Sequence, residues 1–243
     1  MCHSNASSSN LLTPPRRQQE ESKPPVDIPR SSTDFPIRSI GGGGAFQFPT
    51  HLTLSPISAL TPTDGIETDF NEIDTQALAG AFLSVTLAFG SFEMGLFVNY
   101  RQGSFDAPTQ DQGRQVSDGH GGFATVIDSF DLKGDLWLVE FGVAPVLWNP
   151  STEDGTFSLR LAPALGIYFG ALHNMEVNCS GSVVESFSVA DERILGAFIG
   201  PTAQARLRVA KGLHLNFDGA FFRLFGNARG WEGMLLLGFG GDF

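Results

Sequence analysis

The sequence has few cysteines and no long apolar run, and both absences narrow the fold class. Its two cysteines, Cys2 and Cys179, are too few for a disulfide framework or a cysteine-based zinc site. No run of roughly 18 or more apolar residues occurs, which argues against a transmembrane helix. No positively charged segment with an apolar centre follows Met1, so we expect that the numbering of an exported protein begins after its signal peptide or at a misplaced start.

Glycine and phenylalanine are abundant instead, and their abundance favours a β-protein. The 243 residues include 29 Gly and 22 Phe, a combination that suits close strand packing and aromatic faces. The mean hydropathy of +0.01 is low for a bundle of membrane helices. It does not exclude a membrane β-barrel, because a barrel hides its apolar half in alternate positions.

The stretch from Phe157 to Ala171 shows the clearest pattern in the sequence. Every odd position in it is apolar, whereas the even positions are small or polar and include Arg160 and Tyr168. Because successive side chains of a strand point to opposite faces, this alternation predicts a β-strand. Its length suits a tilted membrane crossing of roughly 9–11 residues better than a soluble strand of about 5–6 residues. The small and polar face then fits the interior of a narrow barrel.

The same alternation recurs up to the C-terminus, where it carries a family resemblance. The last predicted strand has an apolar row made of Leu235, Leu237, Phe239 and Phe243, while Gly241 stands where a bulky residue is usual. From residue 45 onward the chain resembles small bacterial outer-membrane barrels of the OmpA-like type. The resemblance implies an all-β, eight-stranded antiparallel up-and-down transmembrane β-barrel in the bacterial outer membrane. It also implies two partners, the outer-membrane lipids and, through the last strand, the barrel-assembly machinery.

Strand counting tests this expectation, because such barrels have an even strand number, short turns on the periplasmic side and longer loops outside. Counting back from Phe243 places the short turns at 211–212, 149–155 and 90–91 on one side. A rival count makes 123–132 a membrane strand in place of 45–54, but it puts the long 103–122 loop on the side of the short turns. The preferred count predicts strands at roughly 45–54, 77–89, 92–102, 135–148, 157–171, 193–209, 213–226 and 231–243.

Residues 1–44 differ in composition from the rest of the chain. They are rich in Pro and Ser and end in the glycine run Gly41 to Gly44. Such a segment cannot bury enough apolar surface to offset its ordering entropy, so we expect a disordered tether over 1–44 and the barrel over 45–243. Met1-Cys2 followed by Ser and Asn resembles the start of a mature bacterial lipoprotein, which makes Cys2 a candidate lipidation site.

The polar rows place many charged residues in the predicted interior. Eight strands leave an interior just wide enough for side chains to fill it. Charges there must pair or reach water, because burying an unpaired charge is costly. The pattern allows either a plug of ion pairs or a narrow path for ions or water. The predicted interior network consists of Glu93, Arg101, Glu140, Arg160, Arg206, Arg208, His214, Asp218, Glu232 and Asp242.

No pattern in the sequence indicates catalytic residues, a cofactor or a metal site. A hydrolytic site needs a hydroxyl nucleophile beside a histidine, and the candidate histidines are His51, His120, His173 and His214. His214 is followed on its own face by Asn216 instead of a serine. His120 and His173 lie in predicted loops without a nucleophile pattern. We therefore expect a protein that is not an enzyme.

The predicted outer loops are strongly acidic. They carry 14 Asp and Glu residues against only Arg114 and Lys133. Such a surface repels nucleic acid. It can attract divalent cations, although 64–74 lacks the regular spacing of a Ca²⁺-binding loop.

The leading functional expectation is a non-enzymatic outer-membrane barrel that serves envelope integrity or surface interaction and whose interior is plugged by ion pairs. Two alternatives stay open. One is a lipid-modifying outer-membrane barrel enzyme. The other is a soluble, lipid-anchored binding barrel, because the segment 196–203 resembles the Gly-rich signatures of soluble lipoprotein barrels.

Overall fold

The computed structural model of the chain describes residues 36–181 and 184–243, and its secondary-structure elements are all β-strands. Cys2 and most of the predicted tether therefore lie outside the described residues. No helix among the described residues is long and apolar enough to cross a membrane. The strands are β1 (Ile37–Gln47), β2 (Thr50–Leu60), β3 (Glu67–Thr75), β4 (Leu78–Phe89), β5 (Phe92–Asp106), β6 (Gln110–Ser117), β7 (Phe123–Pro145), β8 (Phe157–Ser180), β9 (Glu185–Ser188), β10 (Glu192–Ala210), β11 (Leu213–Gly226) and β12 (Ala228–Asp242).

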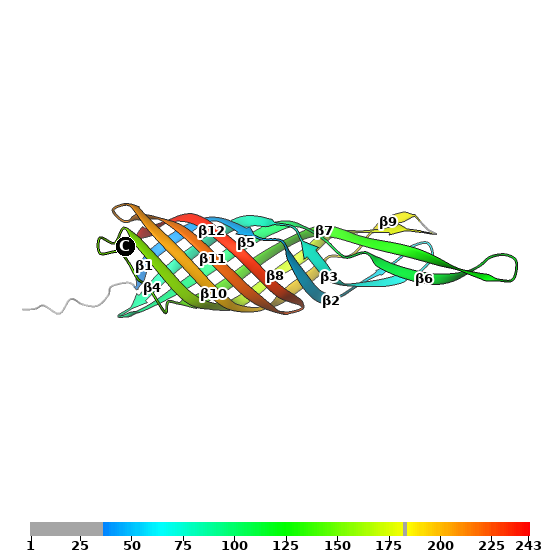
Figure 1. Cartoon of the computed structure of the whole chain (residues 1–243), viewed down its shortest axis with the longest axis horizontal. Coiled ribbons are helices and arrows are strands. Elements are labelled where there is room, and N and C mark those ends of the chain that lie inside the picture. The colour runs from blue at the N-terminus through cyan, green and yellow to red at the C-terminus, as the bar shows by residue number, and fades with distance from the viewer. Residues whose placement is uncertain (1–35, 182–183) are drawn as a thin grey trace, which may run out of the picture. The chain divides into compact units, whose positions relative to one another are not determined.

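Eight of these strands close into an antiparallel barrel (Figure 1). β1 pairs with β4 on one side and with β12 on the other, so that Gly43 faces both Phe82 and Gly238. The remaining neighbours follow the order β4, β5, β7, β8, β10, β11 and β12. Closure removes the open sheet edge that a membrane cannot tolerate. The predicted eight-stranded antiparallel barrel is thereby confirmed. Its strands follow the preferred count, in which 123–132 is not a membrane strand.

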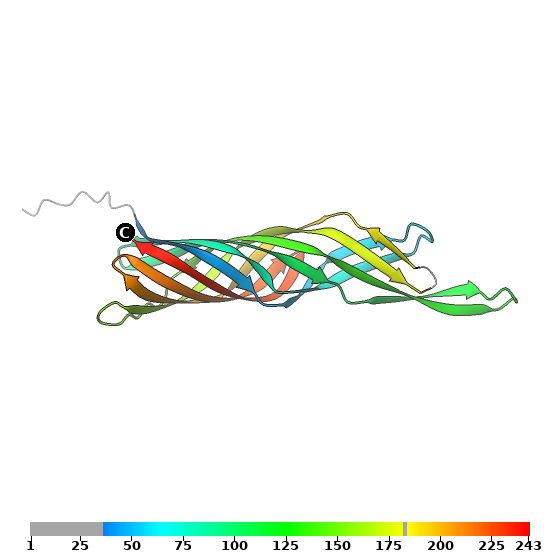
Figure 2. The same cartoon turned by 90° about the horizontal axis from the view of Figure 1, so that it is seen from above.

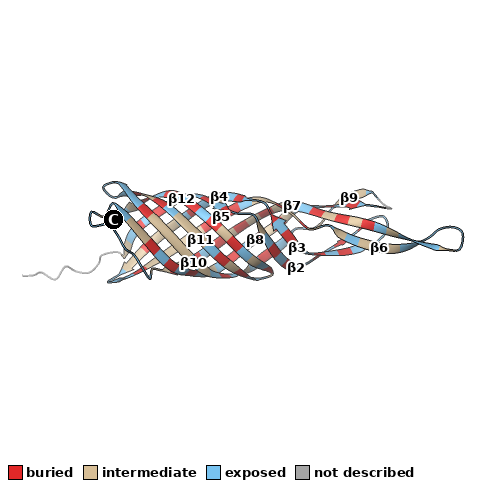
Figure 3. Cartoon of the chain, viewed as in Figure 1, coloured by how far each residue is buried: buried red, intermediate tan, exposed pale blue. Residues whose placement is uncertain are grey.

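The bulky apolar rows point outward from the barrel. Leu161, Ile199 and Leu237 are 39%, 51% and 55% exposed, whereas Arg160 and Arg206 are 6% and 9% exposed. Figure 3 shows the resulting alternation of buried and exposed positions along each strand. An apolar exterior around a polar interior is the arrangement of a membrane barrel. A soluble barrel needs the reverse arrangement, with the bulky rows meeting in a dry core.

The strand ladders continue past one end of the barrel into an extension. The extension comprises β2, β3, β6 and β9 with residues 123–133 of β7 and 173–180 of β8, which pair as the hairpins β2–β3, β6–β7 and β8–β9. Figures 1 and 2 both show these hairpins beyond the barrel end opposite the C-terminus. The predicted outer loops at 64–74 and 103–122 are therefore strand in large part, and His173, predicted in a loop, lies in β8. Residues 123–132, predicted in an outer loop, form the distal part of β7.

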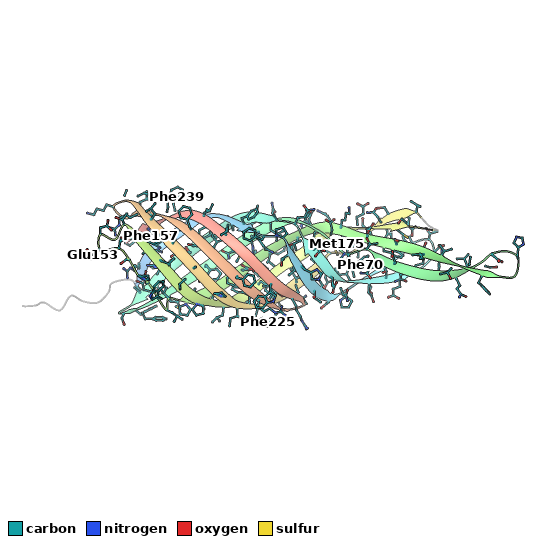
Figure 4. All side chains as sticks on the ribbon, viewed as in Figure 1. Phe70, Glu153, Phe157, Met175, Phe225 and Phe239 are labelled. Atoms are coloured by element: carbon teal, nitrogen blue, oxygen red, sulfur yellow. The ribbon has the colours of Figure 1, made fainter. Side chains whose placement is uncertain are left out.

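The extension has an apolar core, which is continuous with the buried residues of the barrel. Figure 4 shows Phe70 and Met175 in this region, while Phe225 and Phe239 lie on the outside of the barrel. The inward positions belong to the largest buried cluster of the described residues. Water surrounds this part of the chain on the outside, so its apolar residues must turn inward. The core includes Leu52, Leu54, Ile57, Phe70, Ile73, Phe105, Phe130, Leu132, Met175 and Val177.

The first barrel strand differs from its prediction in two respects. It begins at Ile37, so the glycine run that was assigned to the tether lies inside β1 and pairs with both neighbouring strands. The break between β1 and β2 at Phe48-Pro49 also changes the parity of the strand. Phe46 and Phe48 are exposed, but Leu52 and Leu54, which share their even parity, are buried in the extension core.

Candidate functional site

The inward parity brings most of the predicted charge network into the barrel. Arg208 is exposed and Asp242 is 42% exposed, and both line the opening where β1 begins and β12 ends, which we call the terminal mouth. Asp218 is half-buried and accepts a hydrogen bond from Gln204 at 3.0 Å. The buried members are Glu93, Arg101, Glu140, Arg160, Arg206, His214 and Glu232.

Three buried residues form the first of two clusters, which we call the inner triad: Arg101 from β5, Glu140 from β7 and Glu232 from β12. Arg101 donates a hydrogen bond to Glu140 through Nη2, and the same nitrogen lies 3.4 Å from Glu232 Oε2. Asn99 Nδ2 donates to Glu140 Oε2 at 3.1 Å. All three triad side chains are 0% exposed. One guanidinium thus serves two carboxyl groups in a water-excluded interior, where charged hydrogen bonds are strong and unpaired groups are costly.

Apolar side chains lie on both sides of the inner triad. Toward the extension, Phe105, Leu136 and Leu138 are each at most 3% exposed. On the other side, the rings of Phe97, Phe198 and Phe222 stack across the interior. Their centroids are 4.6 to 6.2 Å apart, which is the range of favourable aromatic contacts. Phe97 and Phe222, together with Asn99, also line a cavity of about 90 Å³ that Arg160 and Asp218 border farther down the barrel.

The second cluster lies at the terminal mouth, and we call it the mouth cluster. Its members are Arg38, Glu93, Arg160, Arg206, Arg208, His214 and Asp242. Arg38 and Arg160 both pair with Glu93, the latter with Nη2 at 3.1 Å from Oε2. Asp242 Oδ1 lies 3.6 Å from Arg206 Nη1 and 3.6 Å from His214 Nδ1.

Arg38 is a member of this cluster that sequence reasoning missed, because residues 1–44 were assigned to the tether. A signal for the strand that carries Arg38 was present in the sequence, although it puts the exposed Arg38 itself on the outward parity, beside a register shift between Ile37 and Ser39. Ser39, Ala45 and Gln47 share one parity and are buried, whereas Ile40 and Phe46 on the other parity are exposed. The four glycines between them hid this alternation, since a glycine has no side chain to mark a face.

The candidate histidines lie on different elements. His51 is exposed on β2, with Nδ1 2.8 Å from Asp74 Oδ1. His120 lies between β6 and β7, His173 in β8, and His214 in β11 at the terminal mouth. Among the described residues, no group of three or more His, Cys, Asp or Glu side chains is placed to hold a metal ion. An attraction of divalent cations to the acidic extension therefore stays a prediction.

Cys179 is the one cysteine within the described residues, and it lies in the extension core. Its side chain is buried in β8. Burial, together with the nearby Asp128 carboxylate, raises the pKa of the Cys179 thiol above its ordinary value. Since the thiolate is the reactive form, this position suits a structural cysteine and not a nucleophile.

No protein-family model matches the chain, and no curated protein sequence matches it. Solved structures of bacterial outer-membrane proteins are similar to it in fold at low sequence identity. Neisserial surface protein A (NspA) is 9% identical over 84% of this chain and 97% of its own, with a TM-score of 0.49. OprG from Pseudomonas aeruginosa is 11% identical over 85% and 95%, with a TM-score of 0.45. Ail, the attachment invasion locus protein of Yersinia pestis, is 14% identical over 85% and 98%, with a TM-score of 0.42.

The fold assignment rests on the chain itself. An even number of antiparallel strands, a closed ring, short turns at one end, an apolar exterior and a charged interior are the features of a bacterial outer-membrane β-barrel. The chain has this fold, and the outer membrane is the location that such a barrel requires.

Proposed function

We propose that this protein is a non-enzymatic outer-membrane barrel with a plugged interior, which supports the envelope and presents the extension for surface interactions. The inner triad carries the proposal. Its charged groups are fully buried between two apolar layers, so an ion that crossed the barrel would have to displace both layers and break the triad. Desolvating an ion at these layers costs several kcal/mol or more, which opposes conduction.

The extension supports the surface role. Two of its strands, the distal parts of β7 and β8, are direct continuations of barrel strands, and apolar residues pack its hairpins together. Its outer face is acidic, and the arginine there is occupied, since Arg114 lies 3.0 Å from both Asp64 and Asp128. A rigid acidic surface favours cationic or neutral partners and disfavours nucleic acid. Long loops of such barrels face outward, so in this proposal the terminal mouth faces the periplasm.

The same proposal names two partners in the membrane. Acyl chains of the outer-membrane lipids cover the exposed apolar rows, including Leu161, Ile199 and Leu237. The barrel-assembly machinery engages the C-terminal strand β12, whose pairing with β1 closes the ring. β12 is suited to this role because it pairs with β11 on one side, so that before the ring closes its other edge is open to pair with another strand.

Planar-bilayer conductance tests the plug. The refolded full-length chain should leave the bilayer at its baseline conductance. A variant with Phe97, Phe198 and Phe222 all changed to alanine should conduct more, since it removes the aromatic layer beside the triad. A triple alanine variant at the outward residues Phe217, Phe221 and Phe225 removes the same number of rings from the lipid face and serves as the control. Steady channels from the unmodified protein would refute the plugged interior.

A further inference from the structure

The mouth cluster contains more positive than negative charge. Four guanidinium groups, those of Arg38, Arg160, Arg206 and Arg208, surround one pocket of about 170 Å³. Glu93 and Asp242 are the two carboxylates that pair with them. Within the mouth cluster, the positive charges therefore exceed the negative charges by two. Asp218 lies deeper and is hydrogen-bonded to Gln204, and counting it still leaves one positive charge in excess.

A buried side chain without a hydrogen-bond partner lines the same pocket. The side chain of His214 is 4% exposed, and neither Nδ1 nor Nε2 has a hydrogen-bond partner within the protein. Buried polar groups are almost always hydrogen-bonded, so a histidine in this state calls for a specific explanation. Its ring borders the pocket that the arginines surround, and Asp242 Oδ1 lies 3.6 Å from both His214 Nδ1 and Arg206 Nη1, so one anionic oxygen can approach both side chains.

The pocket is built from several elements and opens to solvent. Arg38 comes from β1, Arg160 from β8, and Arg206 and Arg208 from β10, while His214 comes from β11. Arg208 lies against the turn between β7 and β8, since a side chain on Gly155 would come within 3.3 Å of its Nη2. Figure 4 shows Glu153 of this turn at the end of the barrel where Figure 1, in the same view, marks the C-terminus. The site is therefore accessible from the terminal mouth.

The geometry points to a binding site for a phosphate group at the terminal mouth, held by Arg160, Arg206 and Arg208 with His214 as an additional hydrogen-bond donor. Guanidinium groups match phosphate oxygens in planar, two-point contacts, and a phosphate dianion carries the charge that the cluster lacks. The phosphate can belong to a free anion or to a lipid headgroup at the membrane interface. This inference goes beyond the proposed plug, because the inner triad takes no part in it.

Calorimetric titration of the refolded full-length chain tests this site, in a maltoside detergent that contains no phosphate. One arm uses inorganic phosphate, and the other uses a soluble phosphatidic acid with two short acyl chains. We expect saturable binding with a Kd below about 1 mM in at least one arm. Tighter binding in the first arm identifies a free anion as the ligand, and tighter binding in the second identifies a lipid headgroup.

Two variants and a matched control locate the site. Arg208→Gln and His214→Phe should each weaken binding about tenfold, which is the usual effect of removing one charged hydrogen bond. Arg193→Gln is the control, because Arg193 is also exposed on β10 but lies at the opposite end of that strand, and it should change nothing. Heat-modifiable gel migration confirms that each variant has folded.

Two results would overturn the phosphate site. One is the absence of saturable binding in both arms, and the other is an equal loss of affinity in Arg193→Gln and Arg208→Gln, which would mark general charge attraction. Either result would leave the conductance experiment unaffected. Failure of this site and failure of the plug are therefore distinguishable.

Discussion

Replacing Arg101 by methionine should unfold the barrel at a much lower denaturant concentration. Arg101 is the single cation of the inner triad, and its loss leaves Glu140 and Glu232 together without a counter-charge at 0% exposure. Methionine keeps much of the side-chain volume, so the change removes the charge without opening a large cavity. Any loss of stability then reports on the electrostatics of the two carboxyl groups.

The magnitude follows from what a broken buried ion pair costs. Removing one partner of such a pair destabilises a protein by about 3–5 kcal/mol. With a urea slope of about 3 kcal/mol per molar, a loss of about 4 kcal/mol lowers the unfolding midpoint by roughly 1.3 M. Urea titration of the protein refolded in lipid vesicles measures this shift, and the fluorescence of the three tryptophans reports unfolding.

Two companion variants separate charge from packing. Glu232→Gln should cost little or add stability, because Arg101 keeps Glu140 while one buried carboxyl group disappears. The triple variant Arg101→Met, Glu140→Gln, Glu232→Gln should recover most of the loss, since a neutral set replaces an unpaired one. The reasoning is refuted if Arg101→Met loses less than about 1 kcal/mol or if the triple variant is no more stable than Arg101→Met.

Three further outcomes are expected. Leu237→Arg, on the lipid-facing surface, should destabilise the barrel by about 2–4 kcal/mol in the vesicle unfolding assay. The control Val116→Arg, which is also exposed but lies in β6 of the extension, should leave the stability unchanged. Equal effects of the two changes would contradict the membrane placement. Cys179 should resist maleimide labelling in the folded protein and react in urea, because burial blocks access to the thiol and raises its pKa. Rapid labelling of the folded barrel would show that the extension core is open. Hydrogen bonds from Thr152 and Thr156 lower the pKa of Asp154. The turn between β7 and β8 should therefore keep its stability at neutral pH and lose it only as the pH falls below the ordinary aspartate range. An NMR titration of the Asp154 carboxyl group with a midpoint at the ordinary aspartate value would contradict this.

The barrel strands were predictable because lipid imposes a strict period on one face. Leu161, Ile199 and Leu237 each belong to an unbroken apolar row, and each points outward as predicted. Most of the interior network followed from the same parity, since the opposite face of each row must point inward. The alternation along each strand could not predict that the network divides into the inner triad and the mouth cluster. That division depends on the height of each residue along its tilted strand.

The glycine run in β1 shows why composition misled the sequence reasoning. A stretch of glycines next to a proline-rich segment has the composition of a linker. In the barrel these glycines permit close strand contact: a side chain on Gly43 would place its Cβ 2.0 Å from the carbonyl oxygen of Leu237. The residues that mark a flexible chain in water are here the ones that let β1 and β12 close the ring.

The extension escaped prediction because irregular backbone interrupts its alternation. Asn174 has a positive φ of 53°, and the pairing of β7 with β8 shifts register nearby. Leu172 is therefore inward before the irregularity, and Met175 and Val177 are inward after it, on the opposite parity. An alternating pattern that is followed along the sequence therefore ends at this change of parity in β8. The hydrogen-bonded ladder between β7 and β8 nevertheless continues past it.

The change from lipid to water can be located along the strands, because the outward-facing residues change character there. On β7 the outward row is polar from Ser129 to Asp135 and apolar from Trp137 onward. Asp135 pairs with His173 and Trp137 with Ala171, so β8 changes from apolar to polar at the same level. On β5, Gln102 pairs with Trp137, and the outward row below it is apolar from Tyr100 downward. Three neighbouring strands thus agree on one boundary, and from Trp137 to the end of β7 at Pro145 the apolar row spans about the 9–11 residues that a tilted strand needs to cross the hydrocarbon core.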